Sequence, residues 1–124
     1  MNDELRGALE PLITVFTALS IRYRIVGSVA SSSQGMLRAT LDVDMVVQLE
    51  RIHITHLVAR LGSDYYADPD GMEDALARGS SFNLIHLGSM IKLDLFPLGK
   101  REFDLVSFAR VQTLDLGAEF KVNF

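Results

Sequence analysis

The first hydrophobic pattern along the chain has helical spacing. Apolar residues recur every three or four positions from Leu5 to Leu19, and Asp3 and Glu4 precede them, where the start of a helix favours negative charge. Pro11 interrupts the pattern, because proline is tolerated only in the first turn of a helix. The spacing predicts helix up to about Leu19, with either a kink or a second helix start near Pro11.

Two strand patterns follow, and small polar residues separate them. The run Tyr23–Val26 is short and apolar and ends at Gly27, which indicates a buried strand and a turn. The residues Ser28–Gln34 are small and polar, and we expect them to form a helix packed closely on a sheet. The run Val43–Leu49 alternates between two faces, as a strand does.

Helix and strand patterns continue to alternate in the second half of the chain. The spacing predicts a helix over Ile52–Leu61, closed by Gly62, and a shorter one over Met72–Arg78. Further strands are predicted at Tyr65–Tyr66, at Phe82–Leu87 as an edge strand, and at Ile91–Phe96. Residues 103–124 mix short strand-like pieces with turns. The interleaved order predicts an α+β fold, close to α/β, with one mixed β-sheet flanked by helices.

Composition limits the class of protein. A chain of 124 residues with 48% hydrophobic content fits one folded domain and excludes a largely disordered protein. The net charge of −4 argues against a broad basic surface for nucleic acid, and the absence of cysteine excludes disulfides and cysteine-based zinc sites. The chain has no run of 18 apolar residues, and its start is acidic where a signal peptide is basic. We therefore expect a cytoplasmic protein with no membrane partner.

One stretch of the chain gathers residues that suit phosphate and metal chemistry. The hydrophobic-Gly-Ser run Val26–Ser28 is followed, after thirteen residues, by Asp42–Met45. The period of a strand places Asp42 and Asp44 on one face, and paired carboxylates form an oxygen-only site that suits Mg²⁺. Glycine at a strand end lets the backbone approach a ligand, and the amides of a following helix would face a phosphate. The pattern therefore predicts a metal site beside a phosphate site.

This pattern resembles the signature of the nucleotidyltransferase superfamily, the DNA polymerase β-like group. That signature is a hydrophobic residue, Gly, Gly or Ser, a spacer of similar length, and then Asp-hydrophobic-Asp/Glu-hydrophobic. The family also has a third carboxylate on a later strand, which Asp94 within Ile91–Phe96 matches. The run Arg38–Thr40 before Asp42 is similar to the Arg-x-Thr-x-Asp-x-Asp run of a minimal bacterial group that includes abortive-infection toxin-like nucleotidyltransferases. The resemblance covers about residues 5–108 and implies the nucleotidyltransferase fold.

The resemblance also implies an activity. A nucleoside monophosphate would pass from an NTP to a hydroxyl group on a small molecule, an RNA or a protein, with two Mg²⁺ or Mn²⁺ ions taking part. The metal ligands and catalytic residues would be Asp42, Asp44 and Asp94, the last also helping to deprotonate the acceptor. The nucleotide would be bound by Gly27 and Ser28, at the β and γ phosphates, and by Arg38 or Lys92, which would offset phosphate charge.

The same residues also have ordinary structural interpretations. Asp42, Asp44 and Asp94 could be exposed positions on solvated strands. Arg38 fits a salt bridge as well as a site, and Lys92 fits a solvated strand face. Under these interpretations the chain would be an α/β domain whose three aspartates have no shared function. Binding of an NTP with Mg²⁺ would separate the two interpretations.

A second function keeps the fold without complete catalysis. Members of the superfamily usually carry a further helical region, whereas only about 30 residues follow Asp94. We therefore also expect a partner-dependent module, such as a toxin–antitoxin component, and the strand-like ending Lys121–Phe124 predicts a truncated chain or one completed by a homodimer or a partner subunit. The residues expected to form such an interface are Val106, Phe108, Val111, Leu114, Leu116, Phe120, Val122 and Phe124.

Overall fold

The computed structural model describes residues 3–31, 40–99, 101–103, 113–115 and 121–123. The helices are α1 (Asp3–Ala18), α2 (Arg51–Leu61), α3 (Pro69–Arg78), a 3₁₀ turn η1 (Gly62–Asp64) and a helical turn at 101–103. The strands are β1 (Tyr23–Ser31), β2 (Thr40–Val47), β3 (Tyr65–Tyr66), β4 (Phe82–His86), β5 (Ile91–Pro97), β6 (Thr113–Asp115) and β7 (Lys121–Asn123). The expected α+β class is confirmed.

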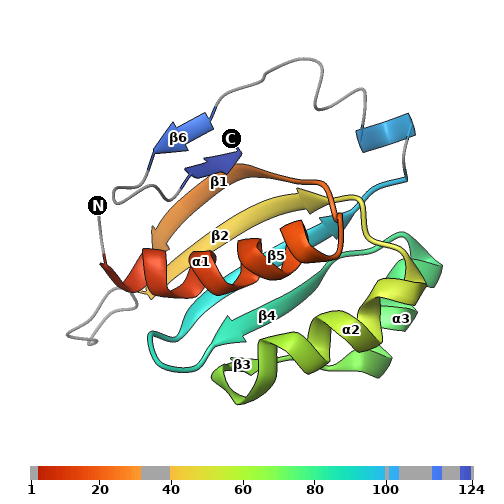
Figure 1. Ribbon diagram of the computed structural model, residues 1–124, viewed down its shortest axis with the longest axis horizontal. Coiled ribbons are helices and arrows are strands. Elements are labelled where there is room, and N and C mark those ends of the chain that lie inside the picture. Colours follow the sequence, from red (N-terminus) through yellow and green to blue (C-terminus); the bar gives the residue numbers. More distant parts are fainter. Residues whose placement is uncertain (1–2, 32–39, 100, 104–112, 116–120, 124) are drawn as a thin grey trace.

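The main sheet has five strands in the order β1-β2-β5-β4-β3 (Figure 1). Strand β2 runs parallel to β5, whereas the β1–β2, β4–β5 and β3–β4 pairs are antiparallel. The sheet is therefore mixed, as predicted. Parallel strands need a long crossover, and here α2 and α3 lie in the chain between β2 and β5. The short strands β6 and β7 form a separate antiparallel pair.

The helices cover one face of the main sheet. The side chains of Asp42, Asp44 and Asp94 lie on the other face. Along β2, the buried residues Val43, Met45 and Val47 alternate with less buried ones, and β5 repeats the pattern with Ile91, Leu93 and Leu95. Figure 1 shows α1 lying across β2 and β5. The helices complete the core with Leu9, Leu12 and Phe16 from α1 and Ile54, Leu57 and Leu61 from α2.

Helix α1 continues through Pro11 to Ala18, so Pro11 does not start a second helix. A proline inside a helix removes one backbone hydrogen bond and crowds the carbonyl four residues earlier. Buried residues on both sides of Pro11, among them Leu9 and Phe16, hold the two halves against the same sheet. Packing therefore outweighs the local cost of the proline. The helix gives way to a turn in which Ser20 has a φ of 58°.

The helix expected directly after Gly27 is wrong over Ser28–Ser31, because β1 continues there as a strand. Strand β2 starts at Thr40, earlier than predicted, and offers an antiparallel partner to this segment. The register shifts between Ile25 and Gly27, which is the irregularity of a β-bulge. Glycine inside a strand often marks a bulge, and here it does so in place of the expected turn. Residues 32–34 of the expected helix lie outside the described residues.

Two other boundaries differ from the predicted ones. Helix α3 starts at Pro69, before the expected Met72, because proline is well accommodated in the first turn of a helix. Strand β4 is not an edge strand, since β3 pairs with its outer side.

The side chains of the apolar set expected to form an interface, from Val106 to Phe124, lie outside the described part of the chain. None of the described helices has the length and apolar character needed to cross a membrane.

Candidate functional site

Asp44 and Asp94 are direct partners across the two parallel strands of the main sheet. The register pairs Asp44 of β2 with Asp94 of β5, and two pairs earlier it places Asp42 opposite Lys92. The residues between them along each strand are buried against the helices, so these four side chains belong to the opposite face of the sheet. The structure thus brings the three predicted carboxylates together on neighbouring strands, with Lys92 among them.

Gly27 of β1 lies next to Asp44, on the side of β2 that faces away from β5. The register pairs Gly27 with Asp44 and Ser28 with Val43. A Cβ atom added at Gly27 would meet nothing within 4 Å, so the space beside Asp44 is open on this side. The structure therefore brings Gly27 to the carboxylates, but on a strand with a bulge and not at the start of a helix. Arg38, the other predicted phosphate-binding residue, lies outside the described residues.

The pKa of the Asp44 carboxyl is raised above its ordinary value. Partial burial is the largest cause, and the charge of Asp94, a hydrogen bond to the Asp94 side chain and the charge of Asp42 add to it, whereas Lys92 lowers it. Each of the raising effects disfavours the ionised form. Burial and repulsion from the neighbouring carboxylates thus act together at Asp44, and a cation bound beside it would relieve the repulsion.

Lys92 compensates the cluster only in part. Its Nζ atom lies 3.9 Å from Oδ1 of Asp94, at the limit of an ion pair, and the side chain is 43% exposed against 23% for Asp94. Such a long, solvated pair contributes little to stability. Lys92 can therefore turn toward an incoming phosphate without a large loss of stability.

The carboxylates fit Mg²⁺ in their chemistry. Among the described residues, no group of three or more His, Asp or Glu side chains is arranged as a complete metal site. Mg²⁺ does not need one, because it commonly binds through one or two carboxylates and completes its shell with waters and substrate phosphates. The paired Asp44 and Asp94 supply two such carboxylates, both with oxygen donors only.

Sequence analysis did not single out several other residues on the same face. Asn83 of β4 is the partner of Asp94, and Ile85 is the partner of Lys92. Arg24, which is buried, is the partner of Val46 on β2, two residues beyond Asp44. The alternation of β1 around the buried Tyr23 and Ile25 could have placed Arg24 on this face, but only the register shows which strand lies beside it.

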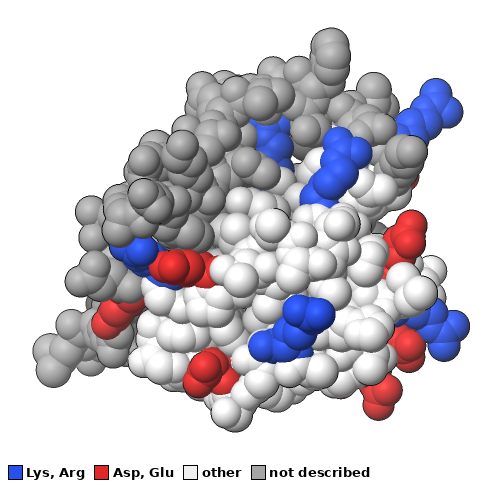
Figure 2. All heavy atoms as spheres, viewed as in Figure 1, with Lys and Arg blue, Asp and Glu red and all other residues white. Residues whose placement is uncertain are grey.

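Charged residues on the helix-covered side of the molecule are dispersed. Figure 2 shows the Lys and Arg side chains there as separate groups, some of them next to Asp or Glu, with uncharged residues between the groups. Two of the ion pairs on the helices are Arg51–Glu73 at 3.0 Å and Arg78–Asp74 at 3.2 Å. On this face the described Lys and Arg side chains form no broad basic patch.

No protein-family model, curated protein or solved structure matches this chain. The resemblance to nucleotidyltransferases consequently depends on the motif residues and on where the sheet places them.

Proposed function

We propose that the face of the sheet opposite the helices binds an NTP with Mg²⁺ and transfers the nucleoside monophosphate to a hydroxyl group. The observation that carries the proposal is the pairing of Asp44 with Asp94 across β2 and β5. Like charges directly opposite each other destabilise a sheet unless something offsets them. A bound cation is the simplest such partner, and the resemblance to the nucleotidyltransferase signature points to a nucleotide as its companion.

The proposed reaction gives roles to the three carboxylates, Lys92 and Gly27. The acceptor oxygen attacks the α-phosphorus of the NTP, the bond from this phosphorus to the pyrophosphate oxygen breaks, and the hydroxyl proton passes to Asp94. Asp42 and Asp44, together with Asp94, would hold the divalent cations, which when bound offset charge on the attacking and leaving oxygens. Lys92 would neutralise charge on the phosphates, and the open space beside Gly27 would admit them to Asp44.

One observation favours a second function, in which the fold binds nucleotide without completing the transfer. Strand β1 continues through Ser28–Ser31, so no helix starts at Gly27 to direct backbone amides at a phosphate. A chain lacking that phosphate site would need a partner for transfer, as in a toxin–antitoxin component. The difference between the two functions is turnover.

Transfer of a labelled nucleotide distinguishes the two functions. The purified chain is incubated with Mg²⁺ and each of the four NTPs labelled at the α-phosphate, with cell RNA, cell protein and a set of small hydroxyl compounds as acceptors. Incorporation that is lost in Asp44→Asn and kept in Asp74→Asn, an exposed carboxylate on α3, supports the enzyme. Binding of an NTP without incorporation supports the second function, and absence of binding contradicts both.

A further inference from the structure

Three residues of different chemistry follow one another on one face of β5. Lys92, Asp94 and Phe96 alternate with the buried Leu93 and Leu95, so their side chains lie on the face of the sheet opposite the helices. Alternate residues of a strand are about 7 Å apart. A cation, a carboxylate and an aromatic ring therefore stand in this order along a single strand.

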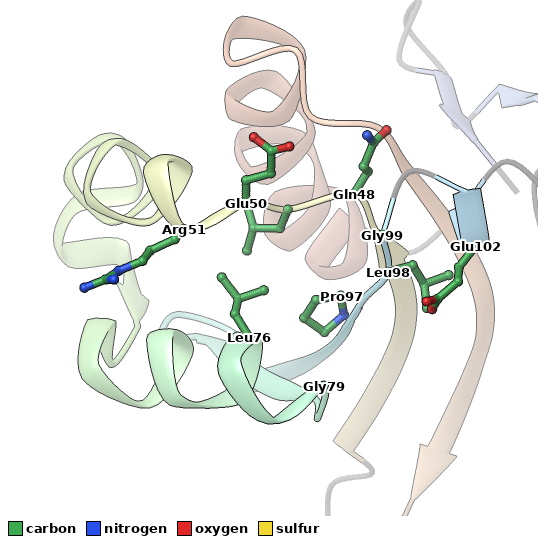
Figure 3. A pocket seen from close by; sticks show the side chains of 10 residues that line it. Gln48, Glu50, Arg51, Leu76, Gly79, Pro97, Leu98, Gly99 and Glu102 are labelled. Carbon is green, nitrogen blue, oxygen red and sulfur yellow. The ribbon is translucent and has the colours of Figure 1, made fainter.

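The end of β5 shows which way Phe96 points. Its neighbour Pro97 is the partner of the buried Val47 and lines a pocket beyond the ends of β2 and β5. Figure 3 shows the side chains of Pro97 and Leu76 directed toward the space between α3 and the end of β5. Because successive side chains of a strand point to opposite faces, Phe96 points away from this pocket and is not part of its lining. The Phe96 ring therefore belongs to the face that carries Asp94.

Apolar side chains lie on the same side of the carboxylates as Phe96. The partner of Phe96 on β2 is the half-buried Val46, which follows Asp44 at the same spacing of two residues. On β1, the bulge inserts Val26 between the partners of Met45 and Asp44, so that two residues oppose one. Val26 is 54% exposed and Phe96 is 40% exposed. The carboxylates therefore have an accessible apolar surface on this side.

A positive charge lies on the other side of the carboxylates. Lys92 is the partner of Asp42 and comes two residues before Asp94. Its side chain is 43% exposed, and its Nζ atom makes only a long ion pair with Asp94, at 3.9 Å. Lys92 can therefore contact the β and γ phosphates of a nucleotide.

An NTP has the same order of groups as this face of β5. Its α-phosphate, where the proposed transfer takes place, is bonded to the β-phosphate on one side and to the nucleoside on the other. With the α-phosphate at Asp44 and Asp94, and with the β and γ phosphates toward Lys92, the nucleoside extends toward Phe96.

The arginines at the end of the sheet are less suited to the phosphates than Lys92. Arg24 is buried and already interacts within the fold. The guanidinium group of Arg22 lies over the Phe103 ring, 4.7 Å from its centre. Arg101 is exposed but lies on the helical turn after β5, outside the sheet. Among the described residues of the sheet, Lys92 is therefore the cation that is both accessible and next to the carboxylates.

Tyr66 would be the aromatic partner of the base if the nucleotide lay the other way round. Tyr66, at 53%, and Phe96, at 40%, are the exposed tyrosine and phenylalanine among the described residues. Tyr66 is the partner of Ile85, which is in turn the partner of Lys92, so two strand spacings of about 10 Å separate it from β5. Phe96 lies on β5 itself and is nearer to the carboxylates.

We propose that the nucleobase of the NTP stacks on the ring of Phe96, with Val26 and Val46 beside the nucleoside. This inference rests on the proposed function, because the α-phosphate at the paired carboxylates sets the direction of the nucleotide. Every base has a π face, so stacking on an aromatic ring provides affinity without selecting one base. Phe96 therefore distinguishes an NTP from a bare chain of phosphates.

Inorganic tripolyphosphate separates the contribution of the nucleoside from that of the phosphates. The full chain is titrated in a calorimeter with each of the four NTPs and with tripolyphosphate, all with Mg²⁺. Phe96→Ala is expected to weaken binding of the tightest NTP about tenfold and to leave the affinity for tripolyphosphate unchanged, whereas Phe96→Trp keeps the NTP affinity. Unchanged NTP affinity in Phe96→Ala, or an equal loss for both ligands, overturns the proposal.

Two further variants control for stability and for orientation. Phe96→Leu keeps a large apolar side chain without a ring, and it should weaken NTP binding even if Phe96→Ala does not fold. Tyr66→Ala removes the other exposed aromatic ring and should leave NTP affinity unchanged. A loss of NTP affinity in Tyr66→Ala but not in Phe96→Leu overturns the proposal and leaves the proposed function intact. Absence of NTP binding by the wild type overturns both.

Discussion

Asp44 lies directly opposite Asp94 on two parallel strands, although fifty residues separate them in the sequence. Like charges directly opposite each other destabilise a sheet, on the scale of the roughly 0.2–1 kcal/mol that one cross-strand pair contributes. The fold keeps both carboxylates on the face of the sheet opposite the helices, and the ammonium group of Lys92, 3.9 Å from Asp94, compensates them only in part. A site that is unfavourable without a cation is what the proposed function needs.

Replacing Asp44 by asparagine should stabilise the chain in the absence of divalent cations. The variant removes the repulsion from Asp94 and Asp42 while keeping the size of the side chain. A gain of 0.2–1 kcal/mol corresponds to a rise in melting temperature of about 1–4 °C. Thermal unfolding in EDTA measures it, with Asp74→Asn as control, which breaks an exposed pair with Arg78 and should give no rise. A lower melting temperature for Asp44→Asn would show that the carboxylate stabilises the empty site.

The gain in stability of Asp44→Asn over the wild type should depend on pH. Because the pKa of Asp44 is raised in the folded state, the folded protein binds more protons than the unfolded chain just above the ordinary value of 3.8. Stability contributed at Asp44 therefore falls as the pH rises through this window, and the wild type loses more than the variant. Urea unfolding at about pH 4.5 and about pH 7 should show a larger advantage of the variant at the higher pH. An advantage that grows toward acid would reverse the sign and contradict the cause assigned here.

Gly27→Ala should separate binding from folding. A Cβ atom at Gly27 meets nothing within 4 Å, and its φ does not lie in the left-handed region, so stability should change by less than about 0.5 kcal/mol. The added methyl group projects beside Asp44, so affinity for Mg²⁺ and NTP should fall, and more so in Gly27→Val. Gly79→Ala is the contrasting variant, since its φ of +67° should cost about 1 kcal/mol without affecting the nucleotide. Unchanged nucleotide affinity in Gly27→Val would remove Gly27 from the site.

The adjacent tyrosines of β3 provide a test of the core. The hydroxyl of Tyr65 donates to the Ala8 carbonyl and ties β3 to α1, and burial raises the pKa of this hydroxyl above its ordinary value. Tyr65→Phe should lower the free energy of unfolding by about 1 kcal/mol. Tyr66→Phe alters an exposed neighbour and should stay within about 0.5 kcal/mol of the wild type. Urea denaturation of the pair measures the difference, and equal values would show that the hydrogen bond does not stabilise the fold.

The hydrophobic pattern of each segment predicted most of the helices and strands, but not which strands pair with each other. The alternation of Val43–Leu49 and Ile91–Phe96 predicted both central strands, because each has one face in the core. The same reasoning misplaced Gly27, since a glycine after an apolar run fits a turn or a bulge, and only the distant start of β2 at Thr40 decides between them. Of the two outcomes predicted at Pro11 only the second helix start is wrong, because packing on both sides of the proline outweighed the local preference.

The candidate site also combines features that the sequence predicts with features that only the strand register shows. Strand period placed Asp42 and Asp44 on one face from the sequence alone. The partner of Asp44 could not be derived in that way, because two helices separate β2 from β5 and the register of parallel strands is decided by packing. Asp94 entered the prediction through the resemblance to a family signature, and the sheet then placed it beside Asp44. Arg38 and the expected interface residues stay predictions.

Calorimetric titration of the full chain with an NTP in the presence of Mg²⁺ tests the central claim most directly. The four NTPs are compared for the wild type, Asp44→Asn, Asp94→Asn and the control Asp74→Asn, with and without EDTA. We predict saturable binding of at least one NTP that needs Mg²⁺, is kept in Asp74→Asn and is lost in both variants of the paired carboxylates. Binding that persists unchanged in Asp44→Asn and Asp94→Asn, or no binding of any NTP by the wild type, would contradict the account.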